Sequence, residues 1–578
     1  MSNRRRRWER SRGLLIGGSG LVLFLLAPLR PFVGTQAQAP EETNVVPPEY
    51  AAQIPAEITE RYQFYGSALL TVAKSLGIED VQGKDLTAPG EEASGSPRKV
   101  RDVGIGVHPT AHENEPTVAA NPVDKKKMVA GSHFGDRCVA YTSSDRGATW
   151  SSGFAMPHLR PLSRCSDPVL AYAPDGSRVY YAYMDIKMAF SPLPFGRAFA
   201  FIDLDIVVSY SDDDGTTWTG PIVALDGKET TILFRPNDAF VLTPGFDYDK
   251  PWIGTHIDDN QSNWVYVTAI RFDTVSPFGF SLAPPVHIAF TRSSNQGATW
   301  SAPAILDSVN TFGPPTTLVQ GSRPTGGVGG EVLVAWYHSG TDGWLTGTFQ
   351  IRTRRSADNG ATFDPIVVAA NDHFETNFFL GPFSFYHRWW ATMFPDVEID
   401  PGGDAHIVYT HDPVQGNATA EEGDIRYVTS GGPPYTVWSP PETVNDDAIG
   451  RAQGYAALET AHGGQSSSLH VVWEDHRLSP NLPISTPFQC FFQRICNSPN
   501  LLYDMFYARK VPGARGWSDN KRISDVSSIS DFIFIGDYND LTVSNKLFAV
   551  WTDRRHQTST FQLEDNVFGT QIIQGGPH

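Results

Sequence analysis

The stretch SSDRGATW, Ser143 to Trp150, occurs four times in this sequence with small changes. The other copies are SDDDGTTW at 211–218, SSNQGATW at 293–300 and SADNGATF at 356–363. Each copy has a Ser, an Asp or Asn two residues later, a Gly, and a Trp or Phe at its end. A unit that recurs along a chain is typical of a fold assembled from similar pieces. We call these four stretches the repeated turns.

The third residue of each repeated turn is Asp145, Asp213, Asn295 or Asp358. Its side chain can accept hydrogen bonds from the backbone of a tight turn, and the Gly supplies the positive φ that such a turn needs. The final aromatic ring can pack between neighbouring sheets. Because the spacing repeats with the fold, we interpret these four residues as structural rather than as acids or metal ligands.

A second pattern precedes the repeated turns: a short strand, a turn rich in Gly, Asn or Asp, and an apolar strand rich in aromatic residues. It begins seven times, near residues 115, 167, 249, 322, 395, 455 and 537. With the strands that flank each repeated turn the unit has four strands, and tandem four-stranded antiparallel units are typical of a β-propeller. The seventh unit shows only three strands, so we expect residues 100–107 to supply its fourth strand and close the ring.

The repeated turns resemble the Asp box of the sialidase and BNR-repeat superfamily, and the resemblance covers roughly residues 100–578. It implies an all-β propeller of four-stranded blades. Sialidases of this superfamily have six blades, whereas we count seven hairpin starts here, so both numbers stay open. Asp boxes also occur in other glycoside hydrolases and in proteins with no known catalysis. The resemblance therefore predicts the fold more sharply than the function.

The charge balance argues against a nucleic-acid partner. With 45 Lys and Arg against 63 Asp and Glu, the formal net charge is -18, and the sequence shows no basic stripe interleaved with aromatics in the propeller region. The 52 Gly and 43 Pro fit a fold with many turns, and 40% of the residues are apolar, which provides a core. We expect a monomer.

The N-terminus has the order of an export signal. Basic residues from Arg4 to Arg12 precede an apolar run from Leu14 to Leu29, and small residues follow before Pro40. We expect residues 1–39 to be a signal peptide or a retained anchor, and the protein to be secreted, periplasmic or on the cell surface. Residues 40–99 read as a linker with one helix at about 56–76, and 100–578 as the propeller. Membrane contact is expected only through an uncleaved N-terminal segment.

The sequence contains four cysteines, which allow three pairings. Cys138 follows the second strand of the first unit and Cys165 precedes the first strand of the next, so both lie on one face in adjacent blades. Cys490 and Cys496 share the long loop at 475–500. Because exported proteins favour disulfides, we predict the bonds Cys138–Cys165 and Cys490–Cys496.

Alternating strand direction places the starts of the first strands and the ends of the second strands on one face of the ring, opposite the repeated turns. We call it the channel face. Loops on a rigid scaffold carry sites, and most charged residues at strand ends are on this face. Several of them should therefore converge on a pocket.

Sialidases hold a substrate carboxylate with three arginines and use an Asp as acid/base and a Tyr, activated by a Glu, as nucleophile. Guanidinium groups fix a carboxylate through paired charge-assisted hydrogen bonds, and a carboxylate beside Tyr eases its attack. The resemblance implies substrate-binding roles for Arg323, Arg388 and Arg451, and catalytic roles for Asp249, Glu474, Asp537 and Tyr538. The first blade, ENEPTVAANP at 113–122, departs from the family because it lacks the arginine of the F-R-I-P motif.

Metal binding is a separate hypothesis. The channel face is rich in Asp and carries His338, His411 and His476, so Ca²⁺ could bind through carboxylates and carbonyls. No two His have a compact metal-ligand spacing, and we expect no other cofactor.

The sequence thus leads to an exported sialidase-like propeller that binds a glycan or glycoconjugate on its channel face. It is either an exo-acting glycoside hydrolase of the exo-α-sialidase type or a non-catalytic propeller that recognises a surface glycan or protein. A third interpretation, a purely structural scaffold, predicts a channel plugged by paired charges and no ligand. Whether it is an enzyme stays open.

Overall fold

The computed structural model describes residues 102–107, 113–161, 163–195, 197–235, 238–273, 285–309, 317–339, 347–374, 394–411, 423–447, 451–460, 468–478, 502–529, 535–543, 546–555 and 565–572. The predicted signal, the 56–76 helix, Arg388, Cys490 and Cys496 lie outside these ranges. Within them, no helix has the length and apolar character needed to cross a membrane.

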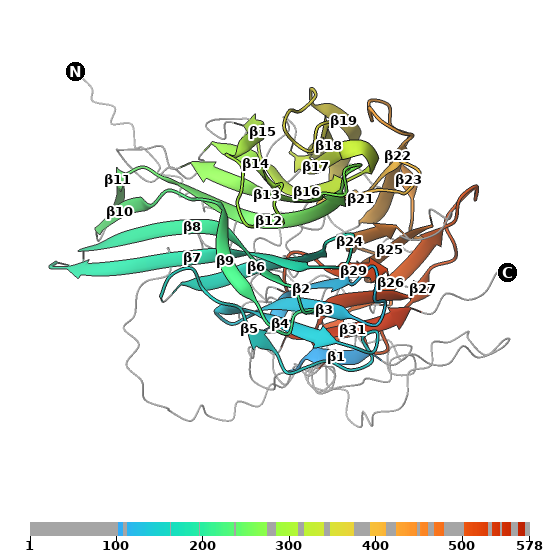
Figure 1. Ribbon diagram of the computed structural model, residues 1–578, viewed down its shortest axis with the longest axis horizontal. Helices are drawn as coiled ribbons and strands as arrows, with labels where there is room; N and C mark the ends of the chain where they lie inside the picture. Colours follow the sequence, from blue (N-terminus) through green and yellow to red (C-terminus); the bar gives the residue numbers. More distant parts are fainter. Residues whose placement is uncertain are drawn as a thin grey trace, which may run out of the picture.

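The strands of the described residues form seven antiparallel sheets, one for each hairpin start (Figure 1). We number these sheets as blades along the chain. Blades 1 to 3 contain β2–β5 (Glu113–Ala120, Met128–Phe134, Arg137–Ser143, Phe154–Ala155), β6–β11 (Arg164–Tyr172, Val179–Leu193, Arg197–Ser211, Thr219–Leu225, Thr230–Arg235, Asp238–Thr243) and β12–β15 (Phe246–Ile257, Asn263–Asp273, Val286–Ser293, Ala304–Val309). Blades 4 and 5 contain β16–β19 (Val319–Gly326, Val332–His338, Gly347–Ser356, Val367–Phe374), with the 3-10 turn η1 (Val328–Gly330), and β20–β23 (Asp396–Ile399, Ala405–His411, Asp424–Ser430, Glu442–Thr443). Blades 6 and 7 contain β24–β28 (Gln453–Thr460, Leu469–Asp475, Leu502–Lys510, Lys521–Arg522, Ser528–Ile529) and β29–β31 (Asp540–Val543, Leu547–Asp553, Asn566–Ile572) with β1 (Val103–Gly106).

The blades close into a ring through their first strands. β2, β6, β12, β16, β20, β24 and β29 contact one another in that order, and β29 in turn contacts β2. β1 pairs with β31, with Val103 opposite Gly569, so blade 7 combines strands from both ends of the described chain. This is the closure predicted from the sequence, and it removes the unpaired edge that an open array would expose.

Arg555 fastens the closing strand. Its guanidinium donates to Asp553 Oδ1 at 2.8 Å, to Asp525 Oδ1 at 2.7 Å and to Asp102 Oδ2 at 2.6 Å. Asp102 immediately precedes β1, and Asp525 lies between β27 and β28, so one side chain ties β1 to the end of β30 and to blade 6. Burial, and then a hydrogen bond with Asp525, raise the pKa of Asp102 to about 9.

Blade 6 repeats this arrangement without the closing strand. Its WEDHR sequence at 473–477 matches WTDRR at 551–555. Arg477 donates to Asp475 at 3.0 Å, to Asp446 at 2.7 Å and to Asn520 at 2.9 Å. The same Trp-x-Asp-x-Arg pattern therefore fastens the outer loops of two consecutive blades.

The core lies between the blades and is built from their second strands. β17, β25 and β30 are buried along their whole length. Trp336, Trp473 and Trp551 occupy these strands and are fully buried, each with its indole N–H donating to an Asp carboxylate. Burial of large rings with their N–H groups paired supplies much of the stabilisation of such a fold.

The four repeated turns adopt one hydrogen-bonded conformation. In the first, the Gly147 N–H donates to Ser143 Oγ at 2.9 Å, the Thr149 N–H to Asp145 Oδ1 at 2.9 Å, and the Trp150 indole to the Gly147 carbonyl at 3.1 Å. The same Ser and Asp or Asn contacts recur in the other three copies. Although partial burial opposes it, hydrogen bonding from Thr149 holds the pKa of Asp145 below its usual value. The repeated turns are structural elements, as their spacing indicated.

Blade 2 extends beyond the ring. β7 and β8 have 15 residues each and remain paired from Val179–Ser211 to Leu193–Arg197, whereas β6 begins only at Arg164, opposite Ile186. β10 pairs with the outer part of β8, and β11 pairs with β10. We call the hairpin from Lys187 to Ile202 the arm, and it projects from the ring together with β10 and β11 (Figure 1).

Candidate functional site

The first strands of five blades carry a β-bulge at the same position. Their pairing shifts between Asn114 and Thr117, Ser166 and Val169, Asp249 and Trp252, Gln320 and Arg323, and Gly454 and Ala457. The first bulged residue has a positive φ in each case: 53° at Glu115, 50° at Asp167, 50° at Lys250, 65° at Gly321 and 54° at Tyr455. Only Gly adopts this conformation without strain. For any other residue the strained backbone costs about 1 to 3 kcal/mol. The fold holds strained side chains at one level of the channel.

Three carboxylates and one ammonium meet at this level. Oxygens of Glu115, Asp167 and Asp537 lie within 4.8 Å of one another, and all three residues are buried. Lys250 Nζ lies 3.6 Å from Asp167 Oδ1 and forms an ion pair with Asp537. These residues come from blades 1, 2, 3 and 7. We call them the carboxylate cluster.

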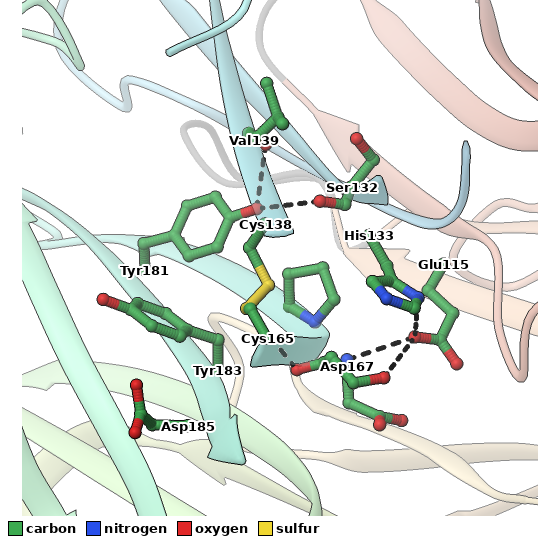
Figure 2. Close-up of a disulfide and its surroundings, with 12 residues drawn as sticks. Glu115, Ser132, His133, Cys138, Val139, Cys165, Asp167, Tyr181, Tyr183 and Asp185 are labelled. Atoms are coloured by element: carbon green, nitrogen blue, oxygen red, sulfur yellow. Dashed lines mark hydrogen bonds and ion pairs between the residues drawn. A yellow bond between two sulfur atoms is a disulfide. The ribbon is translucent and has the colours of Figure 1, made fainter. Parts of the chain in front are cut away.

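Glu115 has further contacts with neighbouring groups (Figure 2). Its Oε2 accepts from the Asp167 N–H at 3.1 Å and from Ser166 Oγ at 3.4 Å, and lies 3.8 Å from His133 Nδ1. The neighbours of the Glu115 carboxylate thus include an amide, a hydroxyl and the His133 imidazole, whereas the carboxylate of Asp537 is ion-paired with Lys250. One cluster thus gives its carboxylates different environments, as acid–base chemistry requires.

The cluster offers the oxygen ligands that Ca²⁺ prefers. Within the described part of the chain it is the one group of three acidic or His side chains with ligand atoms this close together. The ammonium of Lys250 already stands among these oxygens, so the protein provides an internal cation at the place where a metal ion would bind. A second, divalent cation beside Lys250 would be repelled by it.

A small cavity adjoins the cluster. Its volume is about 20 Å³, which is room for roughly one water molecule. Its lining residues are Asp167, Lys250, Pro251, Trp252, Gly321, Ser322, Arg323, Phe394, Asp537 and Tyr538. Ser322 is 1% exposed, and its Oγ has no hydrogen-bond partner among the described residues. The lining therefore combines two carboxylates, an ammonium, a guanidinium and the Ser322 hydroxyl with the aromatic rings of Trp252, Phe394 and Tyr538.

Arg323, the predicted carboxylate-binding residue, lines this cavity but already has two partners. Its Nη1 lies 2.7 Å from Asp396 Oδ2, and its guanidinium stacks 3.6 Å from the centroid of the Trp252 ring. Arg451 is half-buried at the start of blade 6, and Arg388 lies outside the described residues. The described residues therefore place one of the three predicted arginines at the cavity.

Two of the predicted catalytic residues, Asp537 and Tyr538, reach the cavity. The Tyr538 hydroxyl donates to the Pro168 carbonyl at 2.6 Å, and its ring packs edge-on against Trp252 at 5.2 Å. Burial, and then the charges of Glu115 and Asp167, hold the pKa of Tyr538 well above its usual value. This environment disfavours the phenolate that a nucleophilic Tyr must become.

The other two predicted catalytic residues lie beside the cavity rather than in it. Asp249 Oδ1 accepts from the Lys250 N–H at 2.8 Å, which places it at the bulge of blade 3. Glu474 is the last residue but one of β25, and its Oε1 accepts from Nδ2 of Asn539, the residue after Tyr538, at 3.0 Å. Burial raises the pKa of Glu474 to about 8.

The sequence analysis did not select Glu115, Asp167 and Lys250 as site residues. A local signal was present, because each is a charged residue directly followed by Pro at the start of a first strand: Glu115-Pro116, Asp167-Pro168 and Lys250-Pro251. Pro removes one backbone donor where the bulge leaves the ladder unpaired. The motif predicts a bulge, whereas only the ring shows that the three side chains converge.

A disulfide lies directly behind the cluster. Cys138 and Cys165 are bonded, with Cα atoms 5.5 Å apart, and they join blades 1 and 2 (Figure 2). Cys138 is paired in register with His133, and Cys165 precedes Asp167 by two residues. The bond therefore fixes the two strand ends that carry His133 and Asp167.

No family model matches the sequence. Among solved structures, the chain is similar to a protein of unknown function from Dyadobacter fermentans DSM 18053, at 16% identity and a TM-score of 0.39 over 65% of this chain and 94% of that chain. It is also similar to an alpha-L-arabinanase from Penicillium chrysogenum complexed with arabinobiose (12% identity, TM-score 0.39, 82% and 98% covered). A third is the intramolecular trans-sialidase from Ruminococcus gnavus in complex with oseltamivir carboxylate. Its sequence identity is 13% and its TM-score 0.36, over 82% of this chain and 99% of that chain.

At these identities and TM-scores, the assignment of the fold rests on the chain's own strand pairing. Seven sheets, mostly of four strands, form a closed ring. Four blades carry the same Ser–Asp or Ser–Asn turn. With these two features, the fold is that of a sialidase-like β-propeller.

Proposed function

We propose that the protein acts on carbohydrate at its channel face as a glycoside hydrolase that uses the carboxylate cluster. The observation that carries this proposal is the convergence of Glu115, Asp167 and Asp537 on one buried position, with oxygens within 4.8 Å of one another. Most glycosidases use a pair of carboxyl groups, about 5 Å apart when they retain the anomeric configuration.

The two environments suggest the roles. Asp537, neutralised by Lys250, is the charged carboxylate, and Glu115, which faces neutral donors and His133, is the proton donor. The cavity beside them has room for the water that hydrolysis consumes. The sugar would lie at the mouth of the channel, against the aromatic wall of Trp252 and Tyr538.

An exo-sialidase is the more specific version of this proposal. It requires Arg323 to exchange Asp396 for the substrate carboxylate and two further arginines to join it, with Arg388 and Arg451 as the predicted candidates. The negative charge of the cluster opposes an anionic sugar. A neutral sugar is therefore the better fit to the described residues.

Export of the protein is part of the proposal. The basic, apolar and small-residue order of residues 1–39 supports it, and so does the disulfide Cys138–Cys165, since such bonds persist in oxidising compartments. Glycans of the envelope or the surroundings would then be within reach.

The test is hydrolysis of a panel of fluorogenic glycosides, with a sialoside among them, by the wild-type chain and by Glu115→Gln and Asp537→Asn. We expect either variant to lower kcat by about 100-fold or more on the substrate that is turned over. Asp212→Asn is the matched control, because Asp212 pairs with Arg178 on the face of the repeated turns. Turnover that both cluster variants retain would reject the proposal.

A non-catalytic propeller is the second candidate, favoured by the fixed Tyr538 hydroxyl and the partners of Arg323. This candidate predicts that the folded chain turns over none of the glycosides. It also predicts that the chain binds a glycan and that Trp252→Ala weakens this binding.

A further inference from the structure

The arm has a surface unlike the rest of the protein. From Met188 to Ile202 its sequence is MAFSPLPFGRAFAFI, in which Arg197 is the one charged residue and Ser191 the one other polar side chain. The whole chain, by contrast, has a formal charge of -18 and 19% charged residues. Exposed edge strands in soluble proteins are normally protected by charged side chains, above all Lys. Lys187, ion-paired with Glu229, stands where the arm leaves the ring, and beyond it Arg197 is the one charged residue of the hairpin up to Ile202.

The tip of the arm, Pro192 to Arg197, is the most exposed apolar feature of the described surface. Phe195 is 86% exposed, the largest exposure of any large hydrophobic side chain there, and its φ is 64°. The Arg197 guanidinium lies 5.8 Å from the Phe195 ring and donates to the Pro194 carbonyl at 3.2 Å. The turn thus holds an aromatic ring and one cation at its outermost point.

The reach of the arm separates this tip from the ring. β7 continues for seven residues, Lys187 to Leu193, beyond the point where β6 begins. At about 3.3 Å per residue this is roughly 23 Å. The arm leaves the ring at the end where the first strands begin, which is the channel face, so its tip can meet a surface that the ring itself does not touch.

We propose that the tip of the arm docks on a lipid surface by inserting Phe195 into the interface, with Arg197 at the level of the phosphate groups. Aromatic rings favour the membrane interface, and Arg keeps its charged head in the polar layer while its stem lies along apolar surface. The membrane contact expected from the sequence was limited to the N-terminal segment. The arm would provide a second, independent contact.

Two other occupants fit the tip less well. A specific protein interface buries about 800 Å² on each partner and uses roughly 20 residues or more, whereas the described residues of the tip are only five, Pro192 to Phe195 and Arg197. A sugar chain needs several hydrogen-bonding side chains, and beyond Lys187, which is held by Glu229, the arm offers only Ser191 and Arg197. A bilayer interface needs neither a matching shape nor a hydrogen-bond pattern.

The experiment places an environment-sensitive fluorophore on the tip of the full-length chain. Phe195→Cys and the control Val437→Cys are labelled without reduction and mixed with phosphatidylcholine vesicles. Val437 is 78% exposed on a turn of blade 5, so it matches the apolar exposure of Phe195 without the arm. The wild-type chain carried through the same labelling gives the background from its other cysteines. An N-terminal anchor would act equally on all three proteins.

We expect vesicles to shift the emission to the blue at position 195 and leave position 437 unchanged. We also expect Phe195→Asp to weaken vesicle binding about tenfold or more relative to Val437→Asp, since a fully buried Phe contributes about 1.5 to 3 kcal/mol. No shift at position 195, or equal shifts at both positions, overturns the proposal. A shift without lipid that grows with protein concentration also overturns it, because the arm would then contact a second copy of the chain.

Discussion

Lys250 of blade 3 is ion-paired with Asp537 of blade 7, although blades 1 and 2 lie between them in the ring. The contact therefore crosses the channel. Tyr538 makes a similar crossing, since its hydroxyl reaches Pro168 in blade 2 and its ring reaches Trp252 in blade 3. Side chains from several blades thus close the channel at the level of the bulges.

Replacement of Lys250 by Met should destabilise the fold. It leaves Asp167 and Asp537 buried without their counter-charge, and breaking a buried ion pair on one side costs about 3 to 5 kcal/mol. Urea unfolding measures the loss, and Asp537→Asn in the same chain should restore part of it. Lys126→Met, at an exposed site, is the control, and an equal loss there would contradict the assigned role of Lys250.

Glu474 should make stability depend on pH. Burial raises its pKa in the folded chain to about 8, so its neutral form is favoured there. The contribution of Glu474 to stability is complete below the unfolded pKa of about 4.3 and is lost as pH rises towards about 8. Unfolding free energies measured from pH 5 to 9 should fall in the wild-type chain relative to Glu474→Gln. Parallel pH profiles for the two proteins would show that Glu474 is ionised in the folded state.

Arg555→Ala should release β1, because Arg555 is bonded to Asp102 at the edge of that strand. Hydrogen exchange should accelerate at 103–106 and at 566–572, the strand paired with it. Arg477→Ala is the matched change in blade 6, where Asn520 takes the place that Asp102 has in blade 7. It should leave exchange in β1 unchanged, and equal acceleration in both variants would mean general destabilisation instead.

Gly147→Ala should disturb the junction between blades 1 and 7. Gly147 has a φ of 81°, and a Cβ there would come within 2.3 Å of the Phe548 ring in blade 7. We expect a loss of at least about 1 kcal/mol in thermal or urea unfolding, from backbone strain and overpacking together. Asn295→Asp serves as a mild comparison, since its Oδ1 acceptor role in blade 3 can be filled by a carboxylate. A Gly147→Ala chain as stable as wild type would contradict the packing role.

The fold could be predicted from the sequence because its signals are local and repeated. Ser143, Asp145, Gly147 and Trp150 all lie within one turn, so a copy of the pattern specifies the same hydrogen bonds wherever it occurs. The hairpins indicated seven units, a count that the sequence left open against six, and the three strands of the last unit indicated the role of β1. The disulfide between Cys138 and Cys165 followed from their placement on neighbouring strand ends.

The site was harder to predict because it depends on contacts across the ring. The four residues of the carboxylate cluster are spread over more than 400 residues, and three of them, Glu115, Asp167 and Lys250, stand at bulges of different blades. The resemblance to sialidases directed attention to Arg323, whose Asp396 partner lies in the next blade and leaves no mark in the local sequence. The arm was not predicted for a different reason: its apolar strands are typical of a buried blade strand, and only the pairing with β6 shows how far they extend beyond the ring.

The pairing of β1 with β31 has a consequence for biosynthesis. A strand at 103–106 emerges from the ribosome early, yet its partner at 566–572 is made after nearly all of the propeller. The nascent chain can therefore form most of its blades before blade 7 is complete. A product truncated before Asn566 would keep blades 1 to 6 but lack β31, the strand with which β1 pairs. Completion of the ring thus reports that translation has reached the end of β31.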